Sequence, residues 1–176
     1  MSSFGRVYVN DTPQVSRLVR TALFVSDLDR SSRFYKQGLG YHEVYSGGEL
    51  THKVAHALLG VPEDSAIRYE IVKAEGPNFG MIGMFEVKPS PPRVSRASAG
   101  VNIGEGCLVL LTTDIRAVRD RLVDMGAEIV CEPQRLVVRG TLPGGVEMTG
   151  PGSLEMTCRD PDGMLINLIE RPVGSF

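Results

Sequence analysis

The sequence contains no tryptophan, and aromatic residues make up only 6% of the chain. So few rings argue against a surface on which successive bases or sugars stack. Blocks of like charge are also missing, and the formal net charge is only −2. Because nucleic-acid-binding proteins carry a basic patch or stripe, the sequence predicts no nucleic acid as a partner.

Long apolar runs are missing as well. No apolar stretch approaches the ~20 residues that span a bilayer, and residues 1–16 lack the apolar core of a signal peptide. The three cysteines, Cys107, Cys131 and Cys158, are odd in number and lie in apolar, strand-like segments. This pattern argues against a disulfide framework. We therefore expect reduced, buried thiols in a cytoplasmic protein that has no membrane partner.

The chain is organised around residues 159–170, RDPDGMLINLIE. The segment Asp160-Pro161-Asp162-Gly163 predicts a tight turn, because proline fixes φ at the second position and glycine tolerates positive φ at the fourth. Apolar residues on both sides predict a β-hairpin, whose second strand is largely buried and carries Asn167 in its middle. Since a buried amide must be hydrogen-bonded or face a cavity, Asn167 is the first candidate site residue.

Residues 88–92, KPSPP, form a proline-rich stretch that cannot make a regular strand. The segment before them predicts the order β–α–β–β–β, with one short extra helix. Strands are expected at residues 18–25, 41–45, 67–72 and 80–87. Ser26 or Asp27 is expected to cap the first helix, and Gly38 and Gly40 to end it. Gly47 and Gly48 are expected to stop the second strand. A short helix is predicted over residues 50–59.

The same order, with one further short strand, is predicted again after residue 106. Strands are expected at residues 107–112, 128–131, 136–138, 153–158 and 164–170. A helix capped by Asp114 follows the first of them, and its apolar stripe consists of Ile115, Val118, Leu122 and Met125. The glycine-rich segment 141–152 is expected to be a flexible loop, long enough to fold over a pocket.

The two series align as an internal repeat. Asp27-Leu28 corresponds to Asp114-Ile115, and alignment of the last strands places Gly83 opposite Asn167. We therefore predict an α+β fold in which two βαβββ modules form a cupped mixed sheet. The expected boundaries are an arm at 1–16, modules at 17–88 and 107–172, a linker at 89–106 and a tail at 173–176.

The strand-to-helix stretch from Arg20 to Leu28 and the strand after Asp-Pro-Asp-Gly together resemble the vicinal oxygen chelate superfamily. This superfamily holds glyoxalase I, the bleomycin-resistance proteins and extradiol dioxygenases, and the resemblance covers about residues 17–172. It implies that four equivalent strand positions hold the metal, typically through His, Glu or Gln. Here these positions carry Arg20, Gly83, Cys107 and Asn167. A glycine and a permanently charged guanidinium supply no ligand, so we expect no metal cofactor, with a divalent metal as the alternative.

Arg20 has two interpretations. It lies at the start of a strand, where it could be solvated or could pair with a carboxylate such as Glu70 or Glu155. Alternatively, it points into the cup and takes over the role of the metal, because a fixed guanidinium binds carboxylates bidentately and stabilises oxyanions. Asn167 could then orient the same ligand, or it could bridge strand backbones instead.

The other candidate residues also have two interpretations each. Cys107 is a nucleophile only if a base lies beside it, and a small buried hydrophobe is the simpler interpretation. His52 and His56 are four residues apart, which suits either a displaced metal site or a solvated helix face. Either histidine could also contact a ligand or act as an acid or base. Tyr69 and Phe85 are expected in the core or in the pocket wall.

Two functions follow as hypotheses. The first is a metal-free binding protein of the bleomycin-resistance kind, which holds a small, possibly anionic, organic ligand in its cup. The second is a lyase, isomerase or dioxygenase-like enzyme, built around Arg20 without a metal or around a displaced metal site. Small members of the superfamily often complete their cups with a partner chain, so the resemblance also implies a homodimer.

Overall fold

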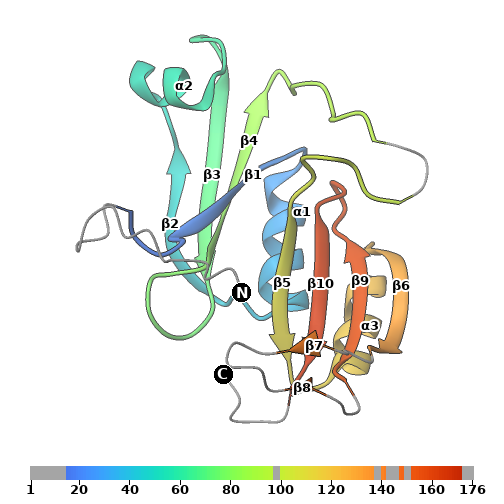
Figure 1. The fold of residues 1–176 in the computed structure, drawn as a ribbon. Coiled ribbons are helices and arrows are strands. Elements are labelled where there is room, and N and C mark those ends of the chain that lie inside the picture. The colour runs from blue at the N-terminus through green and yellow to red at the C-terminus, as the bar shows by residue number, and fades with distance from the viewer. Residues whose placement is uncertain (1–14, 97–99, 137–139, 142–146, 149–151, 172–176) are drawn as a thin grey trace, which may run out of the picture.

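The computed structural model describes residues 15–96, 100–136, 140–141, 147–148 and 152–171, and shows two consecutive modules (Figure 1). The first consists of β1 (Arg20–Val25), α1 (Leu28–Arg33), the π-helical turn η1 (Phe34–Gly38), β2 (Glu43–Glu49), α2 (Lys53–Leu59), β3 (Ala66–Lys73) and β4 (Met81–Lys88). The second consists of β5 (Cys107–Thr112), α3 (Ile115–Asp124), β6 (Glu128–Arg135), β9 (Leu154–Arg159) and β10 (Leu165–Glu170). Between β6 and β9, β7 (Gly140–Thr141) pairs with β8 (Glu147–Met148). In the described ranges no helix has the length and apolar content that crossing a membrane requires.

Each module forms its own four-stranded mixed sheet. Sheet A has the order β1-β4-β3-β2 and sheet B the order β5-β10-β9-β6. In sheet A, Ala22 pairs with Gly83, and in sheet B, Val109 pairs with Asn167. This register confirms the alignment of Gly83 with Asn167. The predicted α+β fold of two βαβββ modules in a cupped arrangement is also confirmed.

The two strand-to-helix corners form as their sequences predict. Oδ1 of Asp27 accepts a hydrogen bond from the backbone N–H of Arg30 at 2.9 Å, and Oδ1 of Asp114 accepts one from Ala117 at 3.0 Å. Each carboxylate therefore caps the unsatisfied N–H groups of a first helical turn. The predicted stripe of α3 is buried at Ile115, Val118 and Leu122, so this helix packs on its sheet as expected.

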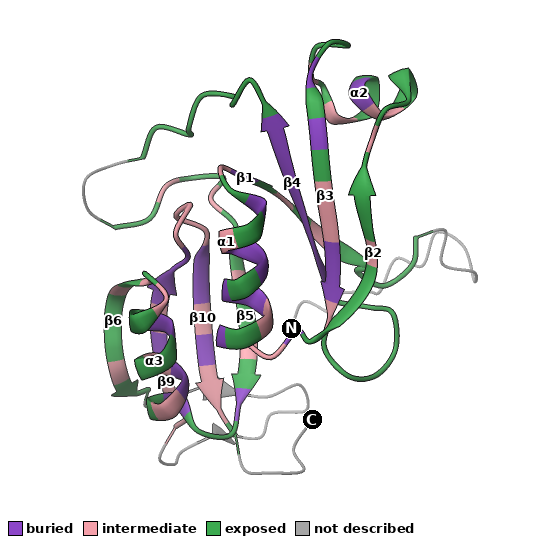
Figure 2. Ribbon diagram, turned by 180° about the vertical axis from the view of Figure 1, so that it is seen from behind, coloured by how far each residue is buried: buried purple, intermediate pink, exposed green. Residues whose placement is uncertain are grey.

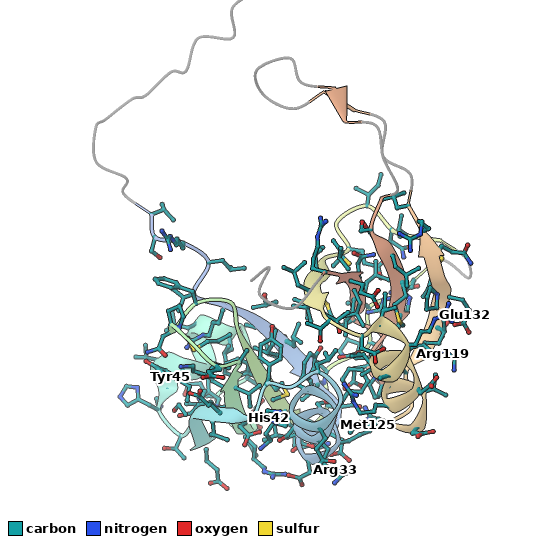
Figure 3. All side chains as sticks on the ribbon, turned by 90° about the horizontal axis from the view of Figure 1, so that it is seen from below. Arg33, His42, Tyr45, Arg119, Met125 and Glu132 are labelled. Atoms are coloured by element: carbon teal, nitrogen blue, oxygen red, sulfur yellow. The ribbon has the colours of Figure 1, made fainter. Side chains whose placement is uncertain are left out.

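The helix-bearing faces of both sheets share one hydrophobic core. Its members include Phe34 and Tyr35 from the first module and Leu122 and Ile166 from the second. Figure 2 shows α1 between the two sheets, with its buried side turned toward them. A Cβ atom added to Gly38 would lie 2.8 Å from Cδ2 of Leu122, so this glycine lets η1 approach α3 closely. Figure 3 shows Met125, at the end of α3, in the same region between the helices.

The opposite face of each sheet carries no α1 or α3, and we call it the open face. On sheet A it includes Arg20, Ala22 and Phe24 of β1, which are exposed and alternate with the core-directed Leu23 and Val25. On sheet B it includes Cys107, Val109 and Leu111 of β5, with the same alternation. Since successive residues of a strand point to opposite faces, the two open faces are turned away from the shared core.

The Asp-Pro-Asp-Gly turn between β9 and β10 ties the second module to the first. Oδ2 of Asp162 accepts from the backbone N–H of Ser26 at 3.0 Å, and its Oδ1 accepts from the Ser26 hydroxyl at 2.6 Å and from Arg30 at 2.9 Å. Oδ2 of Asp160 accepts from the Tyr35 hydroxyl at 2.9 Å in a buried position. The turn that the sequence predicts therefore also makes polar contacts with the start of α1 and with η1.

Several local predictions need correction. Strand β2 does not stop at Gly47 and Gly48 but runs through them, because both pair with β3, after a register shift between Val44 and Ser46. Leu136 follows β6 outside any strand, and the rest of the strand predicted at 136–138 lies outside the described residues. Most of the loop predicted at 141–152 lies outside them too.

The cysteines differ from the prediction in burial. Cys158 is buried, and burial raises the pKa of its thiol to about 11. Cys107 and Cys131 are exposed, which contradicts the prediction that all three are buried. Cys107 is exposed because it lies on the open face of β5. Apolar neighbours in the sequence therefore do not show that a residue of this strand is buried.

Candidate functional site

Arg20 lies on the open face of sheet A, with its aliphatic stem across Gly83. A Cβ atom added to Gly83 would lie 3.5 Å from Cδ of Arg20 and 3.3 Å from Cε2 of Phe85. The arginine stem and the Phe85 ring therefore converge on the space that the missing side chain leaves. The stem can cover apolar surface in this way while the guanidinium stays in contact with solvent.

The two carboxylates predicted as partners of Arg20 bind elsewhere. Glu70 accepts from the Ser32 hydroxyl at 2.5 Å and from Lys36 at 2.9 Å, on the helix-bearing side of sheet A. Glu155 belongs to sheet B and accepts from Ser153 at 2.5 Å. The predicted pairing of Arg20 with Glu70 or Glu155 is therefore wrong, whereas the exposure of Arg20 agrees with its interpretation as a solvated residue. The structure instead puts the guanidinium on an open sheet face.

Three aromatic rings form a row across sheet A beside this position. Phe24 on β1, Phe85 on β4 and Tyr69 on β3 are direct neighbours in the strand register. The ring centroids of Phe24 and Phe85 are 6.3 Å apart, and those of Tyr69 and Phe85 are 6.0 Å apart in a stacked arrangement. Phe85 is 6% exposed and Phe24 is 49% exposed, so the row leads from a covered centre to an open edge. Phe85 is buried in a small apolar cluster and Tyr69 packs against it, which agrees with the prediction that both lie in the core.

Helix α2 covers the far end of this row. Phe85, Ile67 and Val87 pack with Leu59 and with further apolar residues around α2, namely Leu50 and Val61. Figure 1 shows α2 at the end of sheet A where β4 finishes and β3 begins. The aromatic row is therefore enclosed on the α2 side, while β1 and Arg20 remain accessible.

The two histidines of this region have structural partners. Nδ1 of His52 accepts from the backbone N–H of Val54 at 3.2 Å and so caps α2. His56 is buried, which contradicts the prediction of a solvated helix face. Its ring nitrogens contact the carbonyl oxygens of His52 at 3.1 Å and Ser65 at 2.8 Å. A nitrogen that donates to a carbonyl has no lone pair for a metal ion, so these contacts do not support a displaced metal site.

His56 predicts a pH-dependent stability of the α2 region. Both contacts need an N–H donor, and the hydrogen bonds to the carbonyls of Ser65 and His52 raise the pKa of the ring above its usual 6.5. The stabilisation is therefore complete below pH ~6.5 and is lost as the pH rises through the raised pKa. We expect His56→Gln to lower the melting temperature clearly at pH 6 and less at pH 8.5.

The exposed His42 provides a control for this measurement, which is thermal unfolding of each variant across the pH range. His42→Gln removes an exposed imidazole and should change the melting temperature only slightly. If the His56→Gln difference does not change with pH, the charged form of the ring does not stabilise the fold.

On sheet B, the open face carries Cys107 and Asn167. The amide of Asn167 donates to the carbonyl oxygen of Met156 and to the hydroxyl of Thr157, both at 3.3 Å, so it bridges β10 and β9. Although Cys107 is exposed, partial desolvation by the surrounding strands is the main cause that raises the pKa of its thiol, which favours the thiol over the nucleophilic thiolate. These contacts agree with the interpretation of Asn167 as a bridge between strands.

The four positions of the family metal locus thus fall into two pairs on two open faces. Arg20 and Gly83 lie on sheet A, and Cys107 and Asn167 lie on sheet B, with the shared core between the sheets. Within one chain the structure does not bring Arg20 and Asn167 onto one surface. This donor set does not fit a divalent metal, because one thiol and one amide remain beside a fixed positive charge. In the part of the chain that the structure describes, no three His, Cys, Asp or Glu side chains come together as metal ligands.

A groove of about 760 Å³ opens on the helix-bearing side of sheet A, between α1 and the β2–β3 pair. Its central charged groups already bind one another: Glu70 binds Lys36, and Asp29 binds Arg68 at 3.0 Å. These pairs hold α1 on its sheet. We therefore place the candidate site on the open face, where Arg20 has neither of its predicted partners.

Sequence reasoning missed Phe24 as a site residue. The signal was present, because Arg20, Ala22 and Phe24 alternate with Leu23 and Val25 at the period of a strand. Residues that share a face with Arg20 were therefore identifiable before the structure was known.

The sequence matches the Glyoxalase/Bleomycin resistance protein/Dioxygenase superfamily over residues 17–168, and the chain belongs to this superfamily. A comparison with curated protein sequences found no match. Among solved structures, a glyoxalase family protein from Bacillus cereus is similar with a TM-score of 0.72 and 18% identity, over 93% of this chain and 99% of that one.

Two glyoxalase I structures are also similar, with lower TM-scores. The trypanothione-dependent glyoxalase I of Leishmania major gives a TM-score of 0.56 and 19% identity, over 89% of this chain and 87% of that one. A mutant of glyoxalase I from Zea mays gives a TM-score of 0.56 and 18% identity. The match covers 89% of this chain and 45% of the maize chain. At these identities the likeness shows the fold alone.

Proposed function

We propose that the protein binds a small organic anion on the open face of sheet A, without a metal ion, and that Arg20 is the anchor. The observation that carries this proposal is the position of Arg20 across Gly83, beside the ring of Phe85 and away from Glu70 and Glu155. A guanidinium presents a planar fork of N–H donors that matches a carboxylate bidentately. The family locus would thus keep its place in the fold while its chemistry changes from metal coordination to ion pairing.

Binding is favoured over catalysis by the placement of the predicted acid–base groups. Both ring nitrogens of His56 contact backbone carbonyls, and His52 caps α2. The Cys107 thiol lies on the other sheet and has a raised pKa. The arrangement suits a protein that holds its ligand, as the bleomycin-resistance proteins of the superfamily do, better than one that transfers a proton.

The test is a titration with cyclohexanecarboxylate and its neutral amide, followed through the backbone amide resonances of β1 and β4. We expect the acid to bind and to shift the signals around Arg20 and Gly83. The amide has nearly the same shape without the charge and should bind at least about 10-fold more weakly, since loss of a charge-assisted pair removes ~1.5–3 kcal/mol. Equal binding of the two compounds would contradict an anion site.

We further propose that the chain forms a homodimer in which sheet A of one copy faces sheet B of the other. Apolar side chains on both open faces support this: Phe24 is 49%, Val109 60% and Leu111 44% exposed. Such patches mark interaction surfaces. The arrangement would bring the Cys107 and Asn167 positions of one copy opposite Arg20 of the other. Light scattering at micromolar concentration is expected to give twice the mass of the chain, and the mass of one chain would refute the dimer.

A further inference from the structure

The linker that follows β4 encloses a hollow against the β9–β10 turn. Residues 90–94 and 96 of the linker, residues 24–26 at the end of β1 and Asp162 of the turn line a space of about 340 Å³. Figure 1 shows this part of the chain crossing from the end of β4 toward the turn between β9 and β10. We call this space the linker hollow. Arg20 is not among the residues that line it.

Arg93 brings to the linker hollow a positive charge that no carboxylate balances on its own account. Among the described residues that line the hollow, Asp162 is the only acid. Its Oδ1 binds Arg30 at 2.9 Å and Arg93 at 3.3 Å, and the carboxylate also accepts from the N–H and the hydroxyl of Ser26. Arg30 alone balances the charge of Asp162. The charge of Arg93, whose side chain is 69% exposed, is therefore in excess.

Arg96 brings a second charge of the same kind. Its Nε lies 3.5 Å from Oε1 of Glu105, and that oxygen accepts a shorter hydrogen bond from Arg159. Nη1 of Arg96 donates to the carbonyl oxygen of Asp162 at 3.5 Å. The guanidinium lies over Gly163, where an added Cβ would collide with it. Both arginines of the hollow are thus the looser partners of carboxylates that a closer arginine already neutralises.

The remaining walls of the linker hollow are apolar except for two hydroxyl groups. The apolar lining residues are Phe24, Val25, Pro91, Pro92 and Val94. The hydroxyl of Ser26 donates to Asp162, so its proton is already used. The hydroxyl of Ser90 accepts from Lys88 at 3.4 Å and keeps its own proton for another acceptor. One end of the hollow is therefore cationic, and its walls suit an apolar body.

We propose that the linker hollow binds a small phosphate monoester with an apolar body, through Arg93 and Arg96. A phosphate monoester carries about two negative charges at neutral pH and three acceptor oxygens, which matches two guanidinium groups and the Ser90 hydroxyl. A carboxylate has one charge and two oxygens, and a single guanidinium fork satisfies it. This site goes beyond the anion site at Arg20 and does not depend on it.

The experiment is a titration with phenyl phosphate and with inorganic phosphate, followed through backbone amide resonances. We expect phenyl phosphate to shift the signals of Ser90, Arg93, Val94 and Arg96, and to bind at least about 5-fold more tightly than inorganic phosphate, because its ring is removed from water. No shift of these signals would overturn the site. Equal affinities of the two compounds would overturn the apolar body of its ligand.

Replacement of both linker arginines by glutamine tests their role. Arg93→Gln combined with Arg96→Gln should weaken phenyl phosphate by at least about 10-fold, because two charge-assisted pairs are lost. The melting temperature should change by no more than a few degrees, since Asp162 keeps Arg30 and Glu105 keeps Arg159. If the double variant melts much lower, Arg93→Gln alone decides, because Arg93 is exposed. Unchanged affinity of that variant overturns the proposal.

The matched control removes two positive charges elsewhere. Arg116→Gln combined with Arg121→Gln changes two exposed arginines of α3 and should leave phenyl phosphate affinity within about twofold at physiological salt. Arg20→Ala separates this site from the proposed function. It should leave the affinity measured from the linker signals within about twofold while cyclohexanecarboxylate binding is lost. If Arg20→Ala abolishes phenyl phosphate binding and the linker variant does not, the phosphate binds at Arg20 and the linker site is overturned.

Discussion

Replacement of Asp162 by alanine is expected to lower the free energy of unfolding by about 2–4 kcal/mol. The substitution removes the acceptor of the Ser26 N–H, the Ser26 hydroxyl and the Arg30 guanidinium. The Asp162 side chain is only 12% exposed, so water cannot fully replace it. Chemical denaturation of the variant and the natural sequence gives the difference directly.

The matched control for this prediction is Asp120→Ala. Asp120 binds Arg119 at 3.1 Å, but its side chain is 73% exposed. Exposed ion pairs contribute ~0–1 kcal/mol, so this variant should unfold almost as the natural sequence does. Equal effects of the two substitutions would show that the Asp-Pro-Asp-Gly turn does not hold the modules together.

Acid should weaken the same contact. Burial alone would raise the pKa of the Asp162 carboxyl, but the hydrogen bonds from Ser26 and Arg30 outweigh burial and hold the pKa below its usual value of 3.8. The contribution of a carboxyl with a lowered pKa is present above the unfolded value and is lost as the pH falls through the folded one. The difference between Asp162→Ala and the natural sequence should therefore be constant near neutral pH and shrink below pH ~4.

The second large effect is expected at Arg20. Arg20→Ala should weaken an anionic ligand such as benzoate roughly 10- to 100-fold, because a bidentate pair with a carboxylate contributes ~1.5–3 kcal/mol. Arg20→Lys should recover only part of the affinity, since an ammonium lacks the planar fork. The melting temperature should change little, because the guanidinium is exposed and has neither Glu70 nor Glu155 as a partner.

Arg116→Ala is a suitable control, because Arg116 is an exposed arginine of α3, on the helix-bearing side of sheet B. Arg116→Ala removes one positive charge, as Arg20→Ala does, and should leave the affinity for the anionic ligand within about twofold. Any remaining effect of the lower net charge should disappear at high salt, because salt screens interactions between distant exposed charges. The opposite pattern at Arg20, with unchanged binding and a lowered melting temperature, would show that Arg20 serves the fold and not a ligand.

The local parts of the fold could be predicted from the sequence because their causes are local. The caps Asp27 and Asp114 precede their helices directly, and strand β5 was predicted with its observed bounds, Cys107–Thr112. The equivalence of Gly83 and Asn167 followed from the internal repeat, and the strand register confirms it.

The placement of site residues could not be predicted in the same way, because it depends on which face of a strand meets the core. Both faces of β1 are apolar, with Leu23 and Val25 on one side and Ala22 and Phe24 on the other. Cys107 is exposed because it lies on the open face of its strand, and His56 is buried although it belongs to a short helix with exposed neighbours. For Arg20, two interpretations therefore stayed open until the positions of Glu70 and Glu155 were known.

The contact between Asp162 and Ser26 also has a consequence for synthesis on the ribosome. The two residues are 136 positions apart, so the first turn of α1 lacks these bonds until nearly the whole second module has emerged. Closing a loop of this length costs chain entropy before any of its contacts form, which slows folding. A nascent chain that stalls before Asp160 therefore leaves the corner of β1 and α1 without this partner.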